Sequence, residues 1–154
     1  MNITLDVDIS KVQKELKKTQ LEMNRLISKS LLKTAQYGTQ IILDRTSKGI
    51  GYEGKFAPYS PAYRKAKAEG WNKAGSGRRA FGGDKSGIVN LTVHGEMLSS
   101  IQQRGLGSNV VEIFFGRATE AKKAAFNNQK RKFFGFNDSE RTRLNAFFFK
   151  EMMT

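Results

Sequence analysis

A run of apolar residues at helical spacing between residues 10 and 45 constrains the fold of this chain more than any other feature. Its members are Val12, Leu16, Met23, Leu26, Ile27, Leu31, Ala35, Ile41 and Ile42, with Lys and Glu between them. The pattern predicts a long amphipathic helix, whose first turn Asp8 or Ser10 can cap. A continuous helix would be about 50 Å long, which is more than a domain of this size needs. Such a length indicates packing against other subunits, and any break is expected at Gly38 or within 28–30.

The rest of the chain mixes strand and helix patterns. Residues 3–7 alternate between apolar and polar side chains, which predicts a short half-buried strand. Glycines concentrate in 46–87, so this basic region is expected to be a long connection, interrupted by a helix near 61–69 that Ser60 caps and Pro61 begins. Strands are predicted at 88–93 and 109–115, the second one central in its sheet. Helices are predicted at 96–103 and 118–128, and Asp138 is expected to cap a last helix with Leu144, Phe147, Phe148 and Met152 on one stripe.

Together these elements predict a single domain, 1–154, of the α+β class. Its long N-terminal helix would pack on a small, mainly antiparallel sheet, with a hairpin-like pair near 88–115 and further short helices. A chain of 154 residues is too short for a large multidomain enzyme. It has no cysteine, which excludes disulfides and thiolate chemistry, and neither a membrane span nor a secretion signal is expected from its hydropathy pattern.

Charge is the most unusual property of the composition, since 27 Lys and Arg against 14 Asp and Glu give a formal net charge of +13. A chain with this charge is expected to meet nucleic acid, an anionic surface or an acidic protein, although a merely soluble basic surface is the plainer interpretation. Residues 73–85 combine several glycines with Lys73, Arg78, Arg79 and Lys85. This segment is expected to form a flexible basic arm.

A second basic cluster, Lys130, Arg131 and Lys132, is followed directly by Phe133 and Phe134. Its cations could hold phosphates while the rings stack on bases. The other interpretation makes the rings core anchors and the charges a solvated rim. It is favoured for the rings, because Phe-Phe-Gly-Phe before a helix cap is typical of a docking turn. For the charges both interpretations remain open.

The sequence contains no evident catalytic constellation. His94 is the one histidine and is expected to be a helix-start residue, not a base or a metal ligand. No phosphate-binding loop, serine-hydrolase elbow or common metal-dependent nuclease pattern occurs. An enzyme would require Asp44, Glu53, Glu96 or Glu112 to converge in space, which their spacing does not suggest. We therefore predict no catalytic residue, no metal ligand and no cofactor.

Four segments occur in an order that resembles one protein family. They are Arg45-Thr46; 52–63, from Tyr52 to Tyr63; 89–101, from Val89 to Ile101; and 125–136, with Ala125-Phe126-Asn127-Asn128-Gln129 and Arg131-Lys132-Phe133-Phe134-Gly135-Phe136. This order resembles the tailed-bacteriophage virion-morphogenesis and tail-completion proteins. The resemblance implies a small α+β protein with a long N-terminal helix that assembles in rings at the head–tail junction, without catalysis. The chain departs from the family at 71–87, which is longer and more basic than the usual link.

Carried over by position, 91–101 would be a strand and helix at the heart of the fold, and 131–136 the turn that seats the last helix. The positions expected to have structural roles are Tyr59, Ser60, Pro61, Leu91, Gly95, Met97, Leu98, Ile101, Phe134 and Gly135. The candidates for contact with neighbouring proteins or DNA are Lys73, Arg78, Arg79, Lys85, Lys130, Arg131, Lys132, Phe133 and Phe134.

The residues and the resemblance together predict a structural virion protein of a tailed phage. It would be a tail-completion or head–tail joining component at the neck, assembled in the host cytoplasm as a homo-oligomeric ring, of six copies by resemblance alone. Its neighbours would be connector or stopper proteins and tail-tube or tail-terminator proteins, with genomic DNA close by and no membrane. The alternative is a basic nucleic-acid-binding module without catalysis.

Overall fold

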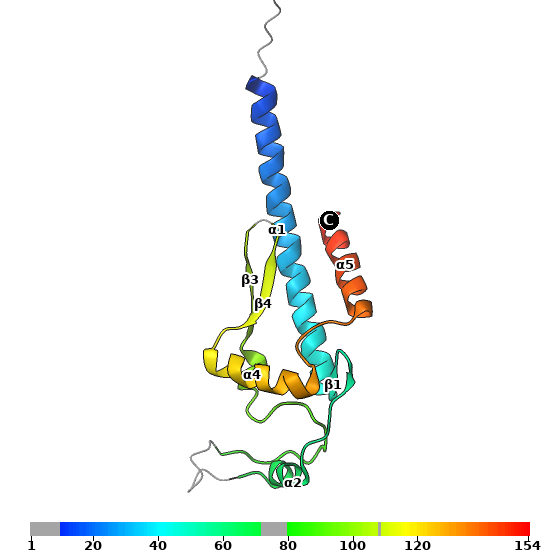
Figure 1. The fold of residues 1–154 in the computed structure, drawn as a ribbon. Coiled ribbons are helices and arrows are strands. Elements are labelled where there is room, and N and C mark those ends of the chain that lie inside the picture. The colour runs from blue at the N-terminus through cyan, green and yellow to red at the C-terminus, as the bar shows by residue number, and fades with distance from the viewer. Residues whose placement is uncertain (1–9, 72–79, 108) are drawn as a thin grey trace, which may run out of the picture.

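The computed structural model describes residues 10–71, 80–107 and 109–154, so the strand predicted at 3–7 lies outside the described residues. The first element, α1 (Ser10–Ser47), is one helix of 38 residues. It has no break at Gly38 or within 28–30. A Cβ on Gly38 would lie 2.9 Å from Cζ of Phe136, so the glycine lets a ring approach the helix and does not interrupt it. Figure 1 shows α1 as the long axis of the molecule, with every other element beside or beyond its C-terminal half.

Two antiparallel hairpins form the β structure. The first pairs β1 (Ile50–Gly51) with β2 (Gly54–Lys55), and the second pairs β3 (Ile101–Gly105) with β4 (Val111–Phe115). The α+β class, with a long N-terminal helix contacting small antiparallel sheets, is confirmed. The prediction that 109–115 is central in a sheet is wrong, because β4 has one partner strand. Its residues are all partly buried because α1 and α4 also contact it.

The strand predicted at 88–93 does not form. In its place the chain makes tight local turns, with Leu91 at a positive φ of 55°. Side chains bond the backbone groups that a strand partner would otherwise take: Thr92 N donates to Asn90 Oδ1 at 3.1 Å, and Leu91 N donates to the Tyr59 hydroxyl at 3.2 Å. The alternation of side chains was therefore misleading, because Asn and Thr compete locally with a β ladder for backbone groups.

The helix predicted at 96–103 is also shorter than expected, since α3 spans only Glu96–Ser99. The carbonyl of Ser100 accepts from Gly116 N at 2.7 Å, and Ile101 pairs with Phe115 at the start of the ladder. Pairing with β4 converts the second half of the predicted helix into β3. The hairpin expected near 88–115 exists, but its strands are 101–105 and 111–115.

Three further helices form close to the ranges that the sequence predicts. The second helix, α2 (Pro61–Glu69), begins as expected, because Tyr63 N donates to the Ser60 side chain and proline occupies the first turn. The fourth, α4 (Ala118–Arg131), continues beyond the predicted end at residue 128. The last, α5 (Asp138–Met152), is capped by Asn137 and not by Asp138. Asn137 forms a capping box with Glu140, which satisfies two backbone amides reciprocally.

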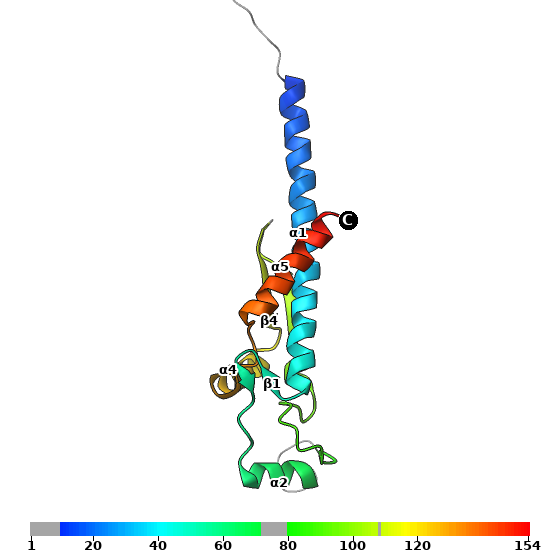
Figure 2. The same cartoon turned by 90° about the vertical axis from the view of Figure 1, so that its right-hand side faces the viewer.

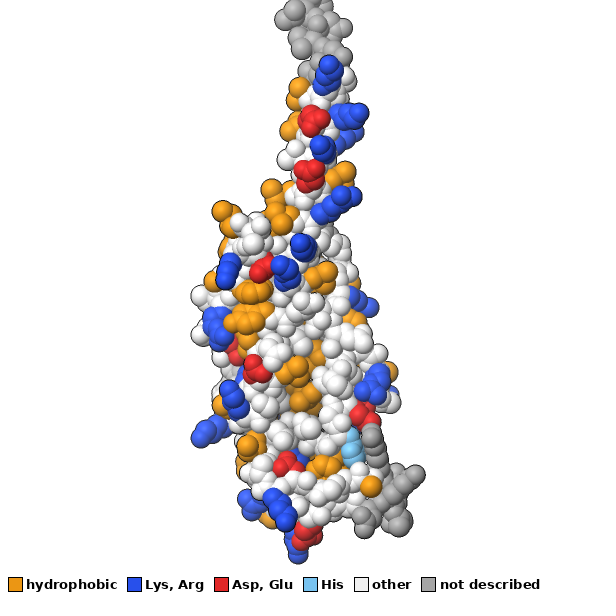
Figure 3. Space-filling model, turned by 180° about the vertical axis from the view of Figure 1, so that it is seen from behind, with side chains coloured by type: hydrophobic (Ala, Val, Ile, Leu, Met, Phe, Trp, Pro, Cys, Tyr) orange, Lys and Arg blue, Asp and Glu red, His pale blue; other side chains and the backbone are white. Residues whose placement is uncertain are grey.

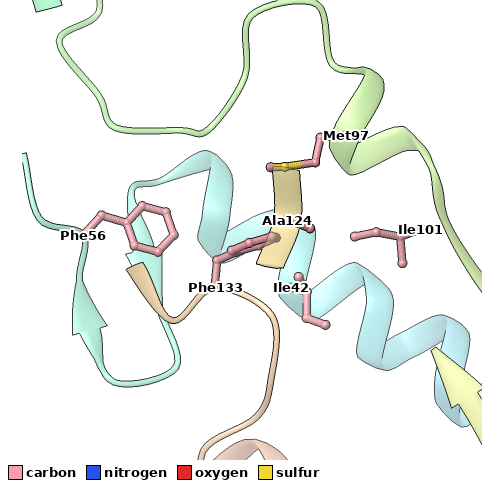
Figure 4. Close-up of a cluster of buried hydrophobic side chains, with 6 residues drawn as sticks. All are labelled: Ile42, Phe56, Met97, Ile101, Ala124 and Phe133. Carbon is pink, nitrogen blue, oxygen red and sulfur yellow. The ribbon is translucent and has the colours of Figure 1, made fainter. Parts of the chain in front are cut away.

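The core lies where α1, α3, α4 and the two hairpins meet. Figure 4 shows its six buried side chains, which are Ile42, Phe56, Met97, Ile101, Ala124 and Phe133. Phe133 is 0 % exposed, which confirms the interpretation of this ring as a core anchor. Phe134 is half-buried and its ring centroid lies 4.7 Å from that of Phe115.

Arg45 joins α1 to the turn that precedes α5. Its guanidinium donates from Nη1 to the Glu140 carboxylate and from Nη2 to the carbonyl of Phe133 at 2.7 Å. The carbonyl of Gly135 accepts from the same Nη2. Residues 132–137 therefore connect α4 to the last helix, and the buried Arg45–Glu140 ion pair fixes the first turn of that helix to α1.

The two ends of the molecule differ in how much packing they have. Figures 1 and 2 agree that α5 and the β3–β4 hairpin run beside the C-terminal half of α1, while α4 lies near its lower end and α2 lies beyond that end. All side chains from Ser10 to Met23 are exposed. None of the helices within the described ranges is long and apolar enough to span a membrane.

Candidate functional site

The first candidate site is the part of α1 that projects beyond the body, residues 10–29, called the projecting helix below. Val12, Leu16 and Met23 recur on one of its faces, and Leu16 is 65 % exposed. At about 100° per residue, Leu21 lies roughly opposite to them and is also exposed. Figure 3 shows hydrophobic side chains between Lys and Arg along this part of the molecule. The projecting helix therefore leaves apolar side chains exposed on two sides.

The second candidate site is a groove along α4, called the α4 groove below. One part of it is a cavity of about 430 Å³ between the segment that enters α2, the 91–93 turn and α4. A second hollow of about 240 Å³ continues it, because the two share Tyr63, Leu91, Val93 and Asn127. Tyr59 and Phe126 add two further rings to the larger part. The walls thus come from three separate stretches of the chain.

One end of the α4 groove is cationic. The Arg131 guanidinium lies 5.0 Å from the centre of the Tyr59 ring, and Arg131 Nε donates to the carbonyl of Ala57 at 3.3 Å. The Lys130 ammonium lies 4.9 Å from the centre of the Phe126 ring. Within the described part of the chain, neither cation has a carboxylate within 4.0 Å. Cation–π contacts place both charges beside rings without neutralising them.

The other end of the groove holds a buried carboxylate. Glu120 is in the first turn of α4, where the helix dipole favours a negative charge. Its Oε1 accepts from Lys123 Nζ at 2.8 Å, whereas its Oε2 has no hydrogen-bond donor among the described groups. The groove is therefore positive toward the C-terminal end of α4, whereas its other end is lined by Glu96, Glu120 and Lys123.

A buried lysine holds the wall of the groove in place. Lys67 Nζ lies 3.0 Å from Asp84 Oδ2 and donates to Asn90 Oδ1 at 2.7 Å, which ties α2 to the 84–90 segment. Hydrogen bonds from Ser86, together with Lys67, hold the pKa of Asp84 well below its ordinary value. Burial raises the pKa of the Tyr59 phenol, although Arg131 acts in the opposite direction. Tyr59 is therefore a neutral ring beside a permanent cation.

The structure brings together some of the residues expected from the sequence and separates others. The α4 groove contains Tyr59, Ser60, Leu91, Lys130 and Arg131, and its second hollow contains Gly95 and Met97. Leu98, Ile101, Phe133 and Phe134 belong to the core or pack against it. Pro61 begins α2, Lys85 is exposed beside Asp84, Lys132 is the C-cap of α4 in the left-handed region, and Gly135 packs against Tyr52. Lys73, Arg78 and Arg79 lie outside the described residues.

Only part of the predicted basic arm falls within the described ranges. Residues 80–85 pack back toward α2: Phe81 bridges to Trp71, and Asp84 N donates to the carbonyl of Lys67. His94 also differs from its predicted role, because Gly95 is the N-cap of α3. The His94 ring instead meets the Phe81 ring edge to face, with centroids 5.9 Å apart.

Sequence reasoning missed Tyr63, Phe126, Asn127 and Glu120 as groove residues. The helical spacing of Phe126 with Lys130 and of Asn127 with Arg131 is the signal that could have found two of them. Of the acidic residues considered for catalysis, Glu112 pairs with Arg104 at 2.7 Å and Asp44 accepts from Gln40, whereas Glu96 lines the second hollow of the groove. The described residues hold no group of three or more His, Asp or Glu that could bind a metal ion.

Comparisons of the chain with known protein families, with curated proteins and with solved structures find no match. The case for a function therefore depends on the projecting helix, the α4 groove and the order of the sequence segments described above.

Proposed function

We propose that this chain is a structural protein of a tailed-phage virion. In this proposal it is a tail-completion or head–tail joining component that forms a homo-oligomeric ring at the neck and has no catalytic activity. The observation that carries the proposal is the projecting helix, whose apolar side chains are exposed over residues 10–23. An exposed apolar surface along a helix of this length supports an interface with other chains.

The two-sided distribution of apolar residues favours a ring over a simple pair. In a closed ring each helix has a neighbour on either side, so both of its faces must be compatible with packing. Leu16 and Met23 offer one such face and Leu21 offers the other. The positions beside the Leu16 face carry Gln13, Gln20, Glu15 and Glu22, and the lysines lie farther round the helix. The Leu21 face of a neighbour carries Lys14, Lys17 and Lys18. Contact of the Leu16 face with that Leu21 face therefore does not oppose lysine to lysine.

The resemblance of roughly 45–140 to tail-completion proteins suggests where the ring would be placed. In the proposal, the ring lies between connector or stopper proteins and the tail-tube or tail-terminator proteins, with six copies by resemblance alone, and it is assembled in the host cytoplasm. A channel that DNA must leave quickly should not bind it tightly, because each neutralised phosphate adds salt-dependent affinity. The net charge of +13 is therefore expected to face neighbouring proteins more than the lumen.

Mass measurement of the purified chain and imaging of virions test this proposal together. We expect a closed oligomer in solution and density for the protein at the neck. Leu16→Glu with Met23→Glu should dissociate the oligomer and leave the circular dichroism of the body intact. Gln13→Glu with Gln20→Glu is the matched control, because it adds the same charge beside the seam without removing apolar side chains. A protein that is a monomer at all concentrations and is missing from virions would refute the proposal.

A nucleic-acid-binding module is the second candidate. The specific observation in its favour is that Lys130 and Arg131 stand beside aromatic rings in the α4 groove without a nearby carboxylate. Retention of duplex DNA should then weaken steeply with salt, by a log–log slope of about −0.9 for each phosphate contacted. Lys130→Ala with Arg131→Ala should reduce that slope by up to about two contacts. A slope near zero would remove this candidate.

A further inference from the structure

The charged side chains of the projecting helix are separated into two stripes. At about 100° per residue, Glu15 and Glu22 lie on one side of the Leu16 face and form an acidic stripe. A basic stripe follows farther round the helix in the same direction, at Lys14, Lys18 and Arg25. Figure 3 shows this order, with acidic side chains between hydrophobic and basic ones. All of these charged side chains are exposed, and neither carboxylate has a lysine or arginine within 4.0 Å in the described part of the chain.

The opposite side of the Leu16 face carries amides instead of charges. These amides belong to Gln13, Gln20 and Asn24. Leu21 follows them, at about 140° from Leu16. Lys17 and Lys18 border Leu21 on its two sides, Lys17 toward the amides and Lys18 toward the acidic stripe. The two flanks of each apolar face thus differ in charge, so the orientation of a neighbouring helix decides which charges meet.

Two orientations are possible when the Leu16 face of one copy lies on the Leu21 face of the next. In a parallel pair, the acidic stripe lies against the basic stripe, and the amides lie against Lys17. In an antiparallel pair the flanks are exchanged, so the acidic stripe meets Lys17 and the basic stripe meets the amides. Oppositely charged flanks set the orientation of paired helices. Charge complementarity therefore favours the parallel pair.

Rotational symmetry also fixes the register of a parallel pair. Copies that are related by rotation about an axis along the helices present equal residues at equal heights. Glu15 is then displaced by about 4.5 Å along the axis from Lys18 of the next copy, and Glu22 by the same amount from Arg25. The same displacement separates residues three apart on one helix, whose charged side chains are able to pair.

We propose that the projecting helices of neighbouring copies pack parallel and in register, with the acidic stripe of one copy paired with the basic stripe of the next. In a closed ring the axis lies on the side where the angle between the two contacts is smaller. On the projecting helix that side carries the three amides, with Lys17 as its one cation between Leu16 and Leu21. The paired stripes then lie on the outside of the ring. This inference rests on the proposed function, for which it identifies the orientation of ring neighbours and the strip that faces the channel.

Thiol cross-linking of the full-length protein tests the orientation. The chain has no cysteine, so introduced thiols are the only ones that react with a short bis-maleimide. We expect a ¹⁵N-labelled Glu15→Cys variant, mixed with an unlabelled Lys18→Cys variant, to give mixed-isotope dimers. Lys17→Cys is the matched control, because it lies one residue away on the other flank of Leu21 and should give few. Links that favour the Lys17→Cys variant, or no links in an intact oligomer, overturn the inference.

A charge exchange provides an independent readout. Glu15→Lys with Glu22→Lys in one protein, and Lys14→Glu with Lys18→Glu in another, should each weaken self-association about tenfold or more. All four side chains are exposed, so their replacement leaves the core intact. Mixing the two variants should restore association, because every contact in an alternating ring of an even number of copies then joins opposite charges.

The two experiments separate this inference from the proposed function. If mixing restores nothing and the Lys18→Cys links are missing while the wild-type ring still enters virions, the inference fails and the proposed function stands. A wild-type protein that stays monomeric and is missing from virions overturns both.

Discussion

Removal of the Glu140 carboxylate should destabilise the protein more than removal of any surface ion pair. The side chains of Arg45 and Glu140 are only 9 % and 11 % exposed. Glu140 also accepts from Asn137 N at 3.0 Å in the capping box of α5. Arg45 Nε has no hydrogen-bond partner within the described residues, so the guanidinium depends on Glu140 for its compensating charge.

Breaking a buried pair by removing one partner costs about 3–5 kcal/mol, because it leaves an uncompensated charge out of water. Glu140→Ala should lower the free energy of unfolding by about this amount, to which the lost capping interaction adds up to ~1 kcal/mol. Glu140→Gln retains an oxygen acceptor for the cap and removes the charge, so it separates the two contributions. Replacing both partners, Arg45→Met with Glu140→Leu, should cost less than Glu140→Ala alone, because no charge is then buried.

Urea unfolding at one fixed protein concentration measures these differences. Glu112→Ala is the surface control: Glu112 and its partner Arg104 have side chains 39 % and 57 % exposed. An exposed pair of this kind contributes about 0.2–1 kcal/mol. If Glu140→Ala costs no more than Glu112→Ala, the Arg45–Glu140 pair does not hold α5 to α1 in the way described above.

Three further predictions concern the core and the wall of the α4 groove. Phe133→Ala should cost about 3–5 kcal/mol in urea unfolding, whereas Phe149→Ala, at a side chain 66 % exposed, should be nearly neutral; equal costs would contradict the assignment of the core. The pKa of Asp84 is lowered, so its contribution to stability is present above the ordinary value of 3.8 and is lost as the pH falls below it. The difference in melting temperature between wild type and Asp84→Asn should therefore shrink below that pH, and a constant difference would count against the Ser86 and Lys67 contacts. Asn90→Ala removes an acceptor from Lys67 and should speed amide exchange over 88–92 by roughly tenfold or more, for a lost hydrogen bond of about 1–3 kcal/mol.

Local signals in the sequence were sufficient for the elements whose stability is local. Helical periodicity identified α1 as a long helix, and the Ser60-Pro61 pair located the start of α2. Both signals depend on neighbours within one or two turns of the same helix, so no knowledge of the rest of the fold is needed. The core position of Phe133 was also predictable, because a run of aromatic side chains just before a helix cap is typical of a turn that docks on the core.

The errors fall where a distant partner decides the backbone conformation. Residues 88–93 alternate like a strand, but the Tyr59 hydroxyl and the Asn90 side chain take their amides. Ile101 has a helical pattern and joins a ladder because Phe115 lies opposite. The Tyr59 hydroxyl lies 32 residues before Leu91, and Phe115 lies 14 residues after Ile101. Partners at such separations leave no periodic mark on the segment they control.

The α4 groove illustrates the same division between local and tertiary information. Its residue types were visible in the sequence, and Tyr59, Lys130 and Arg131 were singled out there. Their meeting in one site depends on Lys67, which fixes α2 to the 84–90 segment, and on Arg45, which fixes the turn after α4 to α1. The sequence by itself determined which elements and which charges this protein has. Only the tertiary structure decided which of them meet, because buried ion pairs and β pairing join residues that are far apart along the chain.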